Sequence, residues 1–168
     1  MSTILTQETG GISPIGIPRV KDLRVGIVVA RWNNHITDAL LEGALSTLES
    51  LGYPRKDHVV LRVPGSIELV HAAALLLEDD NVDAIIMIGC VIRGDTPHFD
   101  YVCQCVTQGC AMLNSRGLIP VIFSVLTTEN EQQALDRAGG KLGNKGSEGA
   151  LAAIEMAALN LQFFDIDQ

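Results

Sequence analysis

The chain is poor in basic and aromatic residues. Among its 168 residues, 12 Lys and Arg stand against 20 Asp and Glu, which gives a formal net charge of −8, and aromatic residues make up only 4%. An acidic chain is a poor partner for the phosphates of a nucleic acid. So few aromatic residues also argue against a wide platform on which bases stack. We therefore expect no nucleic-acid partner.

Long apolar runs and paired cysteines are also missing. No segment approaches the ~20 apolar residues of a membrane span, and the first residues lack a basic stretch followed by an apolar run. The four cysteines form no CxxC pair, so their spacing indicates neither a zinc site nor a redox motif. We expect a cytoplasmic protein with free thiols, no metal and no membrane association.

What the chain does contain is enough apolar side chain for one core, since 47% of its residues are hydrophobic. Residues 1–22 combine Gly and Pro with small and polar residues and show no sustained periodicity. We expect them to form an N-terminal arm that is partly disordered or in contact with another subunit. Residues 23–168 are expected to form a single domain.

Short apolar runs alternate with segments of helical periodicity along this domain. The runs predict strands at 23–30, 58–63, 84–92 and 120–126, and the periodic segments predict helices at 35–52, 67–77, 99–116, 127–139 and about 148–162. Parallel strands need crossover connections, so the pattern predicts an α/β fold of three layers, with a parallel four-stranded sheet flanked by helices on both faces. Thr37 is expected to cap the first helix, and Thr128 with Glu131 has the spacing of a capping box.

Ligands of an open parallel sheet bind beyond the carboxyl ends of its strands, so the residues that follow each strand are the candidates for a site. We expect these residues to gather at one end of the sheet: Arg31-Trp32-Asn33-Asn34, Pro64-Gly65-Ser66-Ile67-Glu68, Arg93-Gly94-Asp95-Thr96-Pro97-His98 and Phe123-Ser124.

Three side chains in these loops indicate a chemistry, although each also has a structural interpretation. Trp32 is either a cap on the core or a wall on which a flat ring stacks. His98 is either structural or a group that takes and gives protons near neutral pH. Glu68 is either an acceptor for ligand hydroxyl groups or a favourable charge at a helix start.

Two places are candidates for binding an anion. The backbone N–H groups of Gly94-Asp95-Thr96 open a helix and suit a phosphate, with the Asp95 carboxylate turned away. Arg137, Lys141 and Lys145 gather around the turn GGKLGNKG, which is either an anion site or a solvated turn. The turn does not match the Walker pattern, which disfavours hydrolysis of nucleoside triphosphates.

Five blocks together resemble the 6,7-dimethyl-8-ribityllumazine synthase family, in its order and spacing from about Leu23 to Leu161. They are VVARWNNHIT, VPGSIELV, IGCVIRGDTPHFDYV, VIFSVLTTEN and AGGKLGNKGSEGALAAIEMA. The resemblance implies a flavodoxin-like domain and a transferase of riboflavin biosynthesis that needs no cofactor. This enzyme condenses 5-amino-6-(D-ribitylamino)uracil with 3,4-dihydroxy-2-butanone 4-phosphate to 6,7-dimethyl-8-ribityllumazine, phosphate and water.

The resemblance also implies roles for individual residues. His98 would transfer protons, Trp32 would stack on the pyrimidine, and Arg137 would pair with the phosphate. Lys145 would reach the polar edge of the ring, with Glu148 assisting. The implied substrate-binding set is Trp32, Asn33, Gly65, Ser66, Ile67, Glu68, Cys90, Val91, Ile92, Gly94, Asp95, Thr96, Phe123, Arg137, Lys145 and Glu148.

The chain departs from the family pattern at Trp32, where Phe is most frequent, and at Ile67, where an aromatic residue is frequent. Stacking is therefore expected to concentrate on the indole, and we expect riboflavin to bind. The family implies a homopentamer with active sites between subunits, and some members build a sixty-subunit shell. Pro14 and Pro18 disfavour the shell, whereas the short glycine-rich turn favours it. The alternative function is a flavin-binding module without turnover.

Overall fold

The computed structural model describes residues 16–79 and 81–164. Its parallel sheet has the strand order β2-β1-β3-β4, so that β2 and β4 are the edges. The strands are β1 (Val25–Ala30), β2 (Val59–Val63), β3 (Ala84–Ile92) and β4 (Val121–Thr128). The predicted parallel four-stranded sheet is confirmed, and the predicted range of the third strand matches β3.

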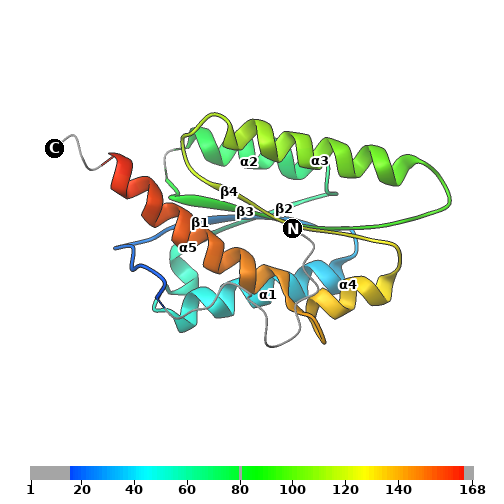
Figure 1. Cartoon of the computed structure of the whole chain (residues 1–168), viewed down its shortest axis with the longest axis horizontal. Coiled ribbons are helices and arrows are strands. Elements are labelled where there is room, and N and C mark those ends of the chain that lie inside the picture. Colours follow the sequence, from blue (N-terminus) through cyan, green and yellow to red (C-terminus); the bar gives the residue numbers. More distant parts are fainter. Residues whose placement is uncertain (1–15, 80, 165–168) are drawn as a thin grey trace.

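Helices cover both faces of this sheet, as the alternating pattern predicts. One face carries α2 (Glu68–Glu78) and α3 (His98–Asn114), and the other carries α1 (Asn34–Ser50), α4 (Glu131–Arg137) and α5 (Lys145–Phe164), as Figure 1 shows. The three-layer α/β architecture is thereby confirmed. None of the helices in the described ranges is long and apolar enough to cross a membrane.

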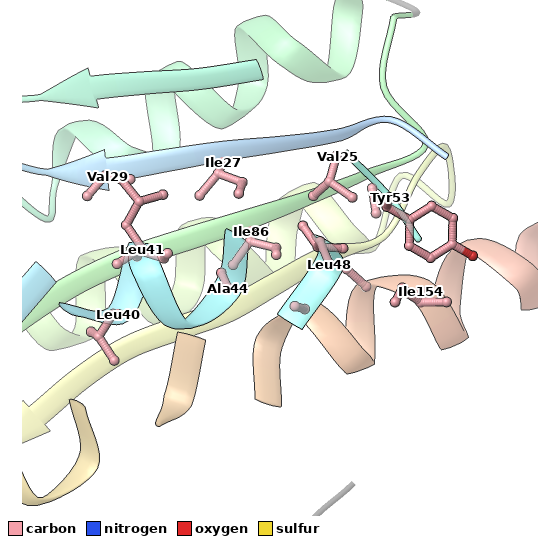
Figure 2. Close-up of a cluster of buried hydrophobic side chains, with 14 of the residues drawn as sticks. Val25, Ile27, Val29, Leu40, Leu41, Ala44, Leu48, Tyr53, Ile86 and Ile154 are labelled. Atoms are coloured by element: carbon pink, nitrogen blue, oxygen red, sulfur yellow. The ribbon is translucent and has the colours of Figure 1, made fainter. Parts of the chain in front are cut away.

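Burial explains why the strands lie in this order. All six residues of β1 are buried, and seven of the nine in β3 are, whereas β2 alternates between half-buried and exposed positions. Strands with continuous apolar runs occupy the centre because both of their faces meet helices. Figure 2 shows the core between the sheet and helices α1 and α5, where Ile27 and Ile86 of the sheet face Ala44, Leu48 and Ile154.

The expected N-terminal arm lies mostly outside the described residues, which begin at residue 16. The part that is described joins the core. Val20 is only 3% exposed, and its N–H donates to the Tyr53 hydroxyl at 3.0 Å.

Two predicted helix caps are wrong. Thr37 is buried inside α1, where its hydroxyl donates to the Ala30 carbonyl at 2.8 Å, and α1 begins after Asn33, whose backbone is left-handed (φ 57°). Thr128 is the last residue of β4, and α4 is capped by Asn130, which accepts from the Gln133 N–H at 3.0 Å. The cap of α1, Asn33, is thus nearer to the end of β1 than Thr37. The cap of α4, Asn130, lies beyond the end of β4, whereas Thr128 is still part of that strand.

The glycine-rich turn folds into a small hairpin that the sequence pattern did not predict. It consists of β5 (Ala138–Gly140) and β6 (Gly143–Asn144), and α5 follows at once from Lys145. A side chain at Gly146 would overlap the Leu40 carbonyl oxygen, so glycine allows α5 to begin directly against α1. This close approach fixes the position of the first turn of α5.

A short 3-10 helix, η1 (Arg55–Asp57), precedes β2.

Candidate functional site

A cavity of about 450 Å³ lies beyond the carboxyl ends of β1, β2 and β3, and we call it the sheet-end cavity. Its walls come from the first three of the predicted loops. The residues that line it are Trp32, Asn33, Gly65, Ser66, Ile67, Glu68, Cys90, Val91, Ile92, Gly94, Thr96, His98, Phe99 and Val102.

Trp32 presents its indole to this cavity from a firmly held backbone. The Trp32 N–H donates to the Pro64 carbonyl at 3.2 Å, and the side chain of Asn33 donates to the Cys90 carbonyl at 3.0 Å. The residue itself is 73% exposed. An indole this exposed covers little of the core of its own chain, so its face is open to a flat ring.

Glu68 and Ile67 enter the cavity from the start of α2. Glu68 is the first residue of that helix, where its charge is favourable, and both side chains are exposed. Ser66, which lies beneath them, is 7% exposed. The loop therefore combines one carboxylate acceptor and one hydroxyl with an apolar wall, a set suited to a ligand that carries hydroxyl groups.

His98 is the first residue of α3 and lines the same cavity. His35 is occupied elsewhere, because its Nε2 lies 2.6 Å from Glu131 Oε1. His58 is buried at the other end of the sheet, where its Nδ1 accepts from the Val25 N–H and burial lowers its pKa. Of the four histidines, His98 is the one that lines this cavity.

Cys90 forms part of the wall of the sheet-end cavity and is not a nucleophile. It is 2% exposed, and burial together with the charge of Glu131 raises its pKa to about 12. The thiol therefore stays protonated at neutral pH, whereas nucleophilic attack requires the thiolate.

A second cavity of about 460 Å³ runs along the outer side of β4, between that strand and α4 and α5. We call it the β4-edge cavity. It is lined by Ile122, Phe123, Ser124, Val125, Leu126, Thr127, Thr128, Arg137, Lys145, Glu148, Gly149 and Ala152. Phe123 is 39% exposed in it, and the Thr128 hydroxyl is buried with no hydrogen-bond partner among the described residues.

Two of the three clustered cations line the β4-edge cavity. Arg137, the last residue of α4, forms no ion pair with any described residue, so its guanidinium remains available to a ligand. Lys145 Nζ lies 2.5 Å from Glu148 Oε2. Lys141 lies outside the cavity and pairs with Asp136 at 3.0 Å, and hydrogen bonds from Gln132 and Lys141 lower the pKa of Asp136. The expected cluster of three cations is therefore reduced to two.

The predicted site residues divide between the two cavities. The residues expected around a ring and at the proton-transfer step line the sheet-end cavity, whereas Phe123, Arg137, Lys145 and Glu148 line the β4-edge cavity. Asp95 lines neither cavity. The expectation that all four loops meet at one end is wrong for Phe123-Ser124, because Phe123 lies inside β4, opposite Met87 of β3.

Sequence reasoning missed several lining residues. Phe99 and Val102 belong to the sheet-end cavity, and Thr127 and Thr128 to the β4-edge cavity. Phe99 directly follows His98, so the start of the helix offered a signal. The two threonines gave none, because only the position of β4 at the sheet edge exposes that side to a cavity. No group of three His, Cys, Asp or Glu side chains in the described ranges could hold a metal ion.

Comparison with known proteins agrees with the resemblance seen in the sequence. The family model of 6,7-dimethyl-8-ribityllumazine synthase matches residues 22–160. A Porphyromonas gingivalis protein of that name is 57% identical over 143 residues, covering 85% of this chain and 89% of the relative. Proteins of the same name from Phocaeicola vulgatus and Flavobacterium johnsoniae are 56% and 52% identical, cover 83% and 87% of this chain, and are themselves covered over 83% and 77%.

Proposed function

Because the chain belongs to the 6,7-dimethyl-8-ribityllumazine synthase family, we propose that its sheet-end cavity and the β4-edge cavity of a neighbouring copy form one active site. The chain is a transferase of riboflavin biosynthesis. It condenses 5-amino-6-(D-ribitylamino)uracil with 3,4-dihydroxy-2-butanone 4-phosphate to 6,7-dimethyl-8-ribityllumazine, phosphate and water. One observation carries the proposal: the groups suited to a ring and the groups suited to a phosphate line different cavities of the same chain.

The pyrimidine substrate would occupy the sheet-end cavity. Trp32 stacks on its ring, and Asn33, Ser66 and Ile67 bound it, while Glu68 accepts from hydroxyls of the ribityl chain. Gly65, Cys90, Val91 and Ile92 complete the walls. The support is that each of these residues lines the cavity and that the indole is exposed there.

The phosphate substrate would lie where the two cavities meet. Arg137 of the neighbouring copy pairs with the phosphate through its planar guanidinium, a geometry that suits phosphate oxygens. Gly94, Asp95 and Thr96 add the backbone N–H groups at the start of α3. Lys145 reaches the polar edge of the ring and Glu148 orients it, while Phe123 packs against the substrates. The free guanidinium of Arg137 among the described residues supports this role.

His98 would transfer the protons that the condensation requires. The pyrimidine amine attacks the ketone and loses water to form an imine, and phosphate then leaves as a proton is removed from carbon. Tautomerisation and ring closure release the second water. Every step moves a proton, and an imidazole can both accept and donate one near neutral pH.

Positioning should supply much of the rate. Holding two reactants and a leaving group in place can lower a barrier by roughly 7–11 kcal/mol. A site assembled from cavities with largely fixed walls suits this mode of catalysis. It needs no cofactor, because the leaving phosphate and the ketone already carry the required reactivity.

The family forms oligomers, and we propose a homopentamer in the cytoplasm, with the sixty-subunit shell as the alternative. A ring of head-to-tail contacts brings two different surfaces of one chain together at every interface. Light scattering distinguishes the two assemblies directly.

The experiment that tests the function is a lumazine absorbance assay after both substrates are mixed with the protein. We expect product to appear only when both substrates are present, with release of inorganic phosphate. A flavin-binding module would bind riboflavin and form no lumazine, so that outcome would overturn the enzymatic assignment.

A further inference from the structure

Arg93 lies at the end of β3, between the two cavities, and contacts three segments at once. Its N–H donates to the Thr128 carbonyl at 2.8 Å, which extends the pairing of β3 with β4 by one residue. Its Nε donates to Glu129 Oε2 at 2.7 Å, and its Nη2 donates to Asp100 Oδ1 at 3.2 Å. The guanidinium carbon also lies 4.1 Å from the centre of the Phe99 ring.

Two of these contacts are with Phe99 and Asp100, the residues that follow His98. Phe99 and Asp100 belong, with His98, to the first turn of α3. A guanidinium that stacks on one of them and pairs with the other restrains the rotation and the tilt of that turn. Since all three residues share one turn of helix, the same contacts restrain the backbone of His98.

The start of α3 has few other restraints. Pro97 occupies the cap position and supplies no side-chain hydrogen bond to the helix. The preceding loop is exposed, and no atom lies within 4 Å of the place where a side chain on Gly94 would begin. The contacts of Arg93 with Phe99 and Asp100 therefore restrain a helix start that no side chain caps.

We infer that Arg93 is a positioning residue for the reaction: its contacts with Phe99, Asp100 and Glu129 hold the first turn of α3 so that the His98 imidazole faces the bound intermediate. The inference rests on the proposed role of His98. Through Glu129, which directly follows β4, Arg93 also ties this turn to the strand that walls the β4-edge cavity.

The contacts contribute more to orientation than to folding. The side chains of Arg93, Asp100 and Glu129 are 39%, 52% and 60% exposed, and ion pairs this exposed contribute little to stability. The hydrogen bonds that Arg93 donates to Asp100 and Glu129 raise its pKa, so its charge is constant at any working pH. Loss of the side chain should therefore affect turnover while the protein stays folded.

A double-mutant cycle tests the inference, with Arg93→Gln made in the natural sequence and in the His98→Ala variant. We expect Arg93→Gln to lower kcat roughly tenfold in the natural sequence, because small misplacements of a reacting group are costly. In the His98→Ala background it should leave kcat unchanged within about twofold, because the residue it positions is gone. KM for the pyrimidine should stay the same in both backgrounds.

Arg55→Gln is the matched control. Arg55 also pairs with two carboxylates, Glu42 and Glu49, but it precedes β2 at the opposite end of the sheet. This variant should retain the natural kcat, and the thermal midpoints of both arginine variants should stay close to that of the natural protein.

Equal loss of kcat in the two backgrounds would overturn the inference, since it would mean that Arg93 acts independently of His98. An unchanged kcat in Arg93→Gln alone would also overturn it. If that variant does not fold, Asp100→Asn takes its place in the same cycle and is judged by the same outcomes. Absence of lumazine from the natural protein would instead refute the proposed function and the inference together.

Discussion

The two cavities are alike in size and opposite in chemistry. The sheet-end cavity, about 450 Å³, brings together an indole, an imidazole and a carboxylate from three loops. The β4-edge cavity, about 460 Å³, presents Arg137 and Lys145 beside one edge strand. Neither holds both the groups that suit a ring and the cations that suit a phosphate. The difference supports the proposal that one copy of the chain supplies two unlike halves of a site.

Sheet topology explains why the halves are separate. In the order β2-β1-β3-β4, the chain leaves β1 in one direction and β3 in the other, so a crevice opens between their carboxyl ends. Trp32 and Cys90 flank this crevice, and the Asn33 side chain bridges it. Among the described residues, β4 has no further strand beside it, so the cations near it face outward, where another subunit could approach.

The largest expected effect separates the cavities by substrate. Arg137→Ala should raise KM for 3,4-dihydroxy-2-butanone 4-phosphate roughly tenfold to a hundredfold, because it removes charge-assisted hydrogen bonds to the phosphate. KM for the pyrimidine should change little. Steady-state kinetics with each substrate varied in turn measures both values.

Lys141→Ala is the control for this substitution, because Lys141 comes from the same turn but pairs with Asp136 outside the cavity. It should leave both KM values near those of the natural protein. If Arg137→Ala weakened both substrates equally, the assignment of the phosphate to the β4-edge cavity would be wrong.

Removal of the His98 side chain should lower kcat rather than the affinity for the substrates. His98→Ala is expected to reduce kcat by a moderate factor, on the order of tenfold, because positioning supplies much of the rate and water can carry some protons. His35→Ala, which loses only a surface pair with Glu131, should behave like the natural protein. A His98→Ala variant that bound both substrates and had no activity would contradict this expectation.

The smallest expected effect concerns the binding of riboflavin at Trp32. This is the only tryptophan of the chain, so riboflavin stacked on it should quench the intrinsic fluorescence. Trp32→Phe should weaken riboflavin binding severalfold, since the smaller ring stacks less well; affinity is then measured from flavin fluorescence. Phe163→Leu, an exposed aromatic change at the end of α5, should leave the affinity unchanged. Colourless protein with unaltered Trp32 fluorescence would refute retention of flavin.

The fold can be predicted from the sequence more completely than the site. Apolar runs predict β1 and β3 because burial on both faces demands apolar side chains at every position. The loops after β1, β2 and β3 are then placed correctly, since parallel strands end at the same edge. The order of the strands in the sheet cannot be predicted in this way, because periodicity does not indicate which strand lies at an edge.

The errors follow from that missing strand order. Phe123 faces a cavity from within β4 because no strand in residues 16–79 and 81–164 pairs with the outer side of β4. Lys141 pairs with Asp136 because of the way the β5–β6 hairpin turns, which spacing alone does not encode. The contacts of Arg93 with Glu129 likewise exist only because β4 lies beside β3.

Mixed assemblies show whether each active site takes one cavity from each of two subunits. One copy would carry Trp32→Ala with His98→Ala, the other would carry Arg137→Ala, and different affinity tags would select assemblies that contain both. Each variant alone should have low kcat/KM for the phosphate substrate.

In rings assembled at random from equal amounts of the two copies, roughly a quarter of the interfaces would combine two intact cavities. We expect the mixed assemblies to recover about this fraction of the natural kcat/KM, well above either parent. Activity that never exceeds the mean of the two parent variants would show that each chain holds a complete site, and the shared active site would be wrong.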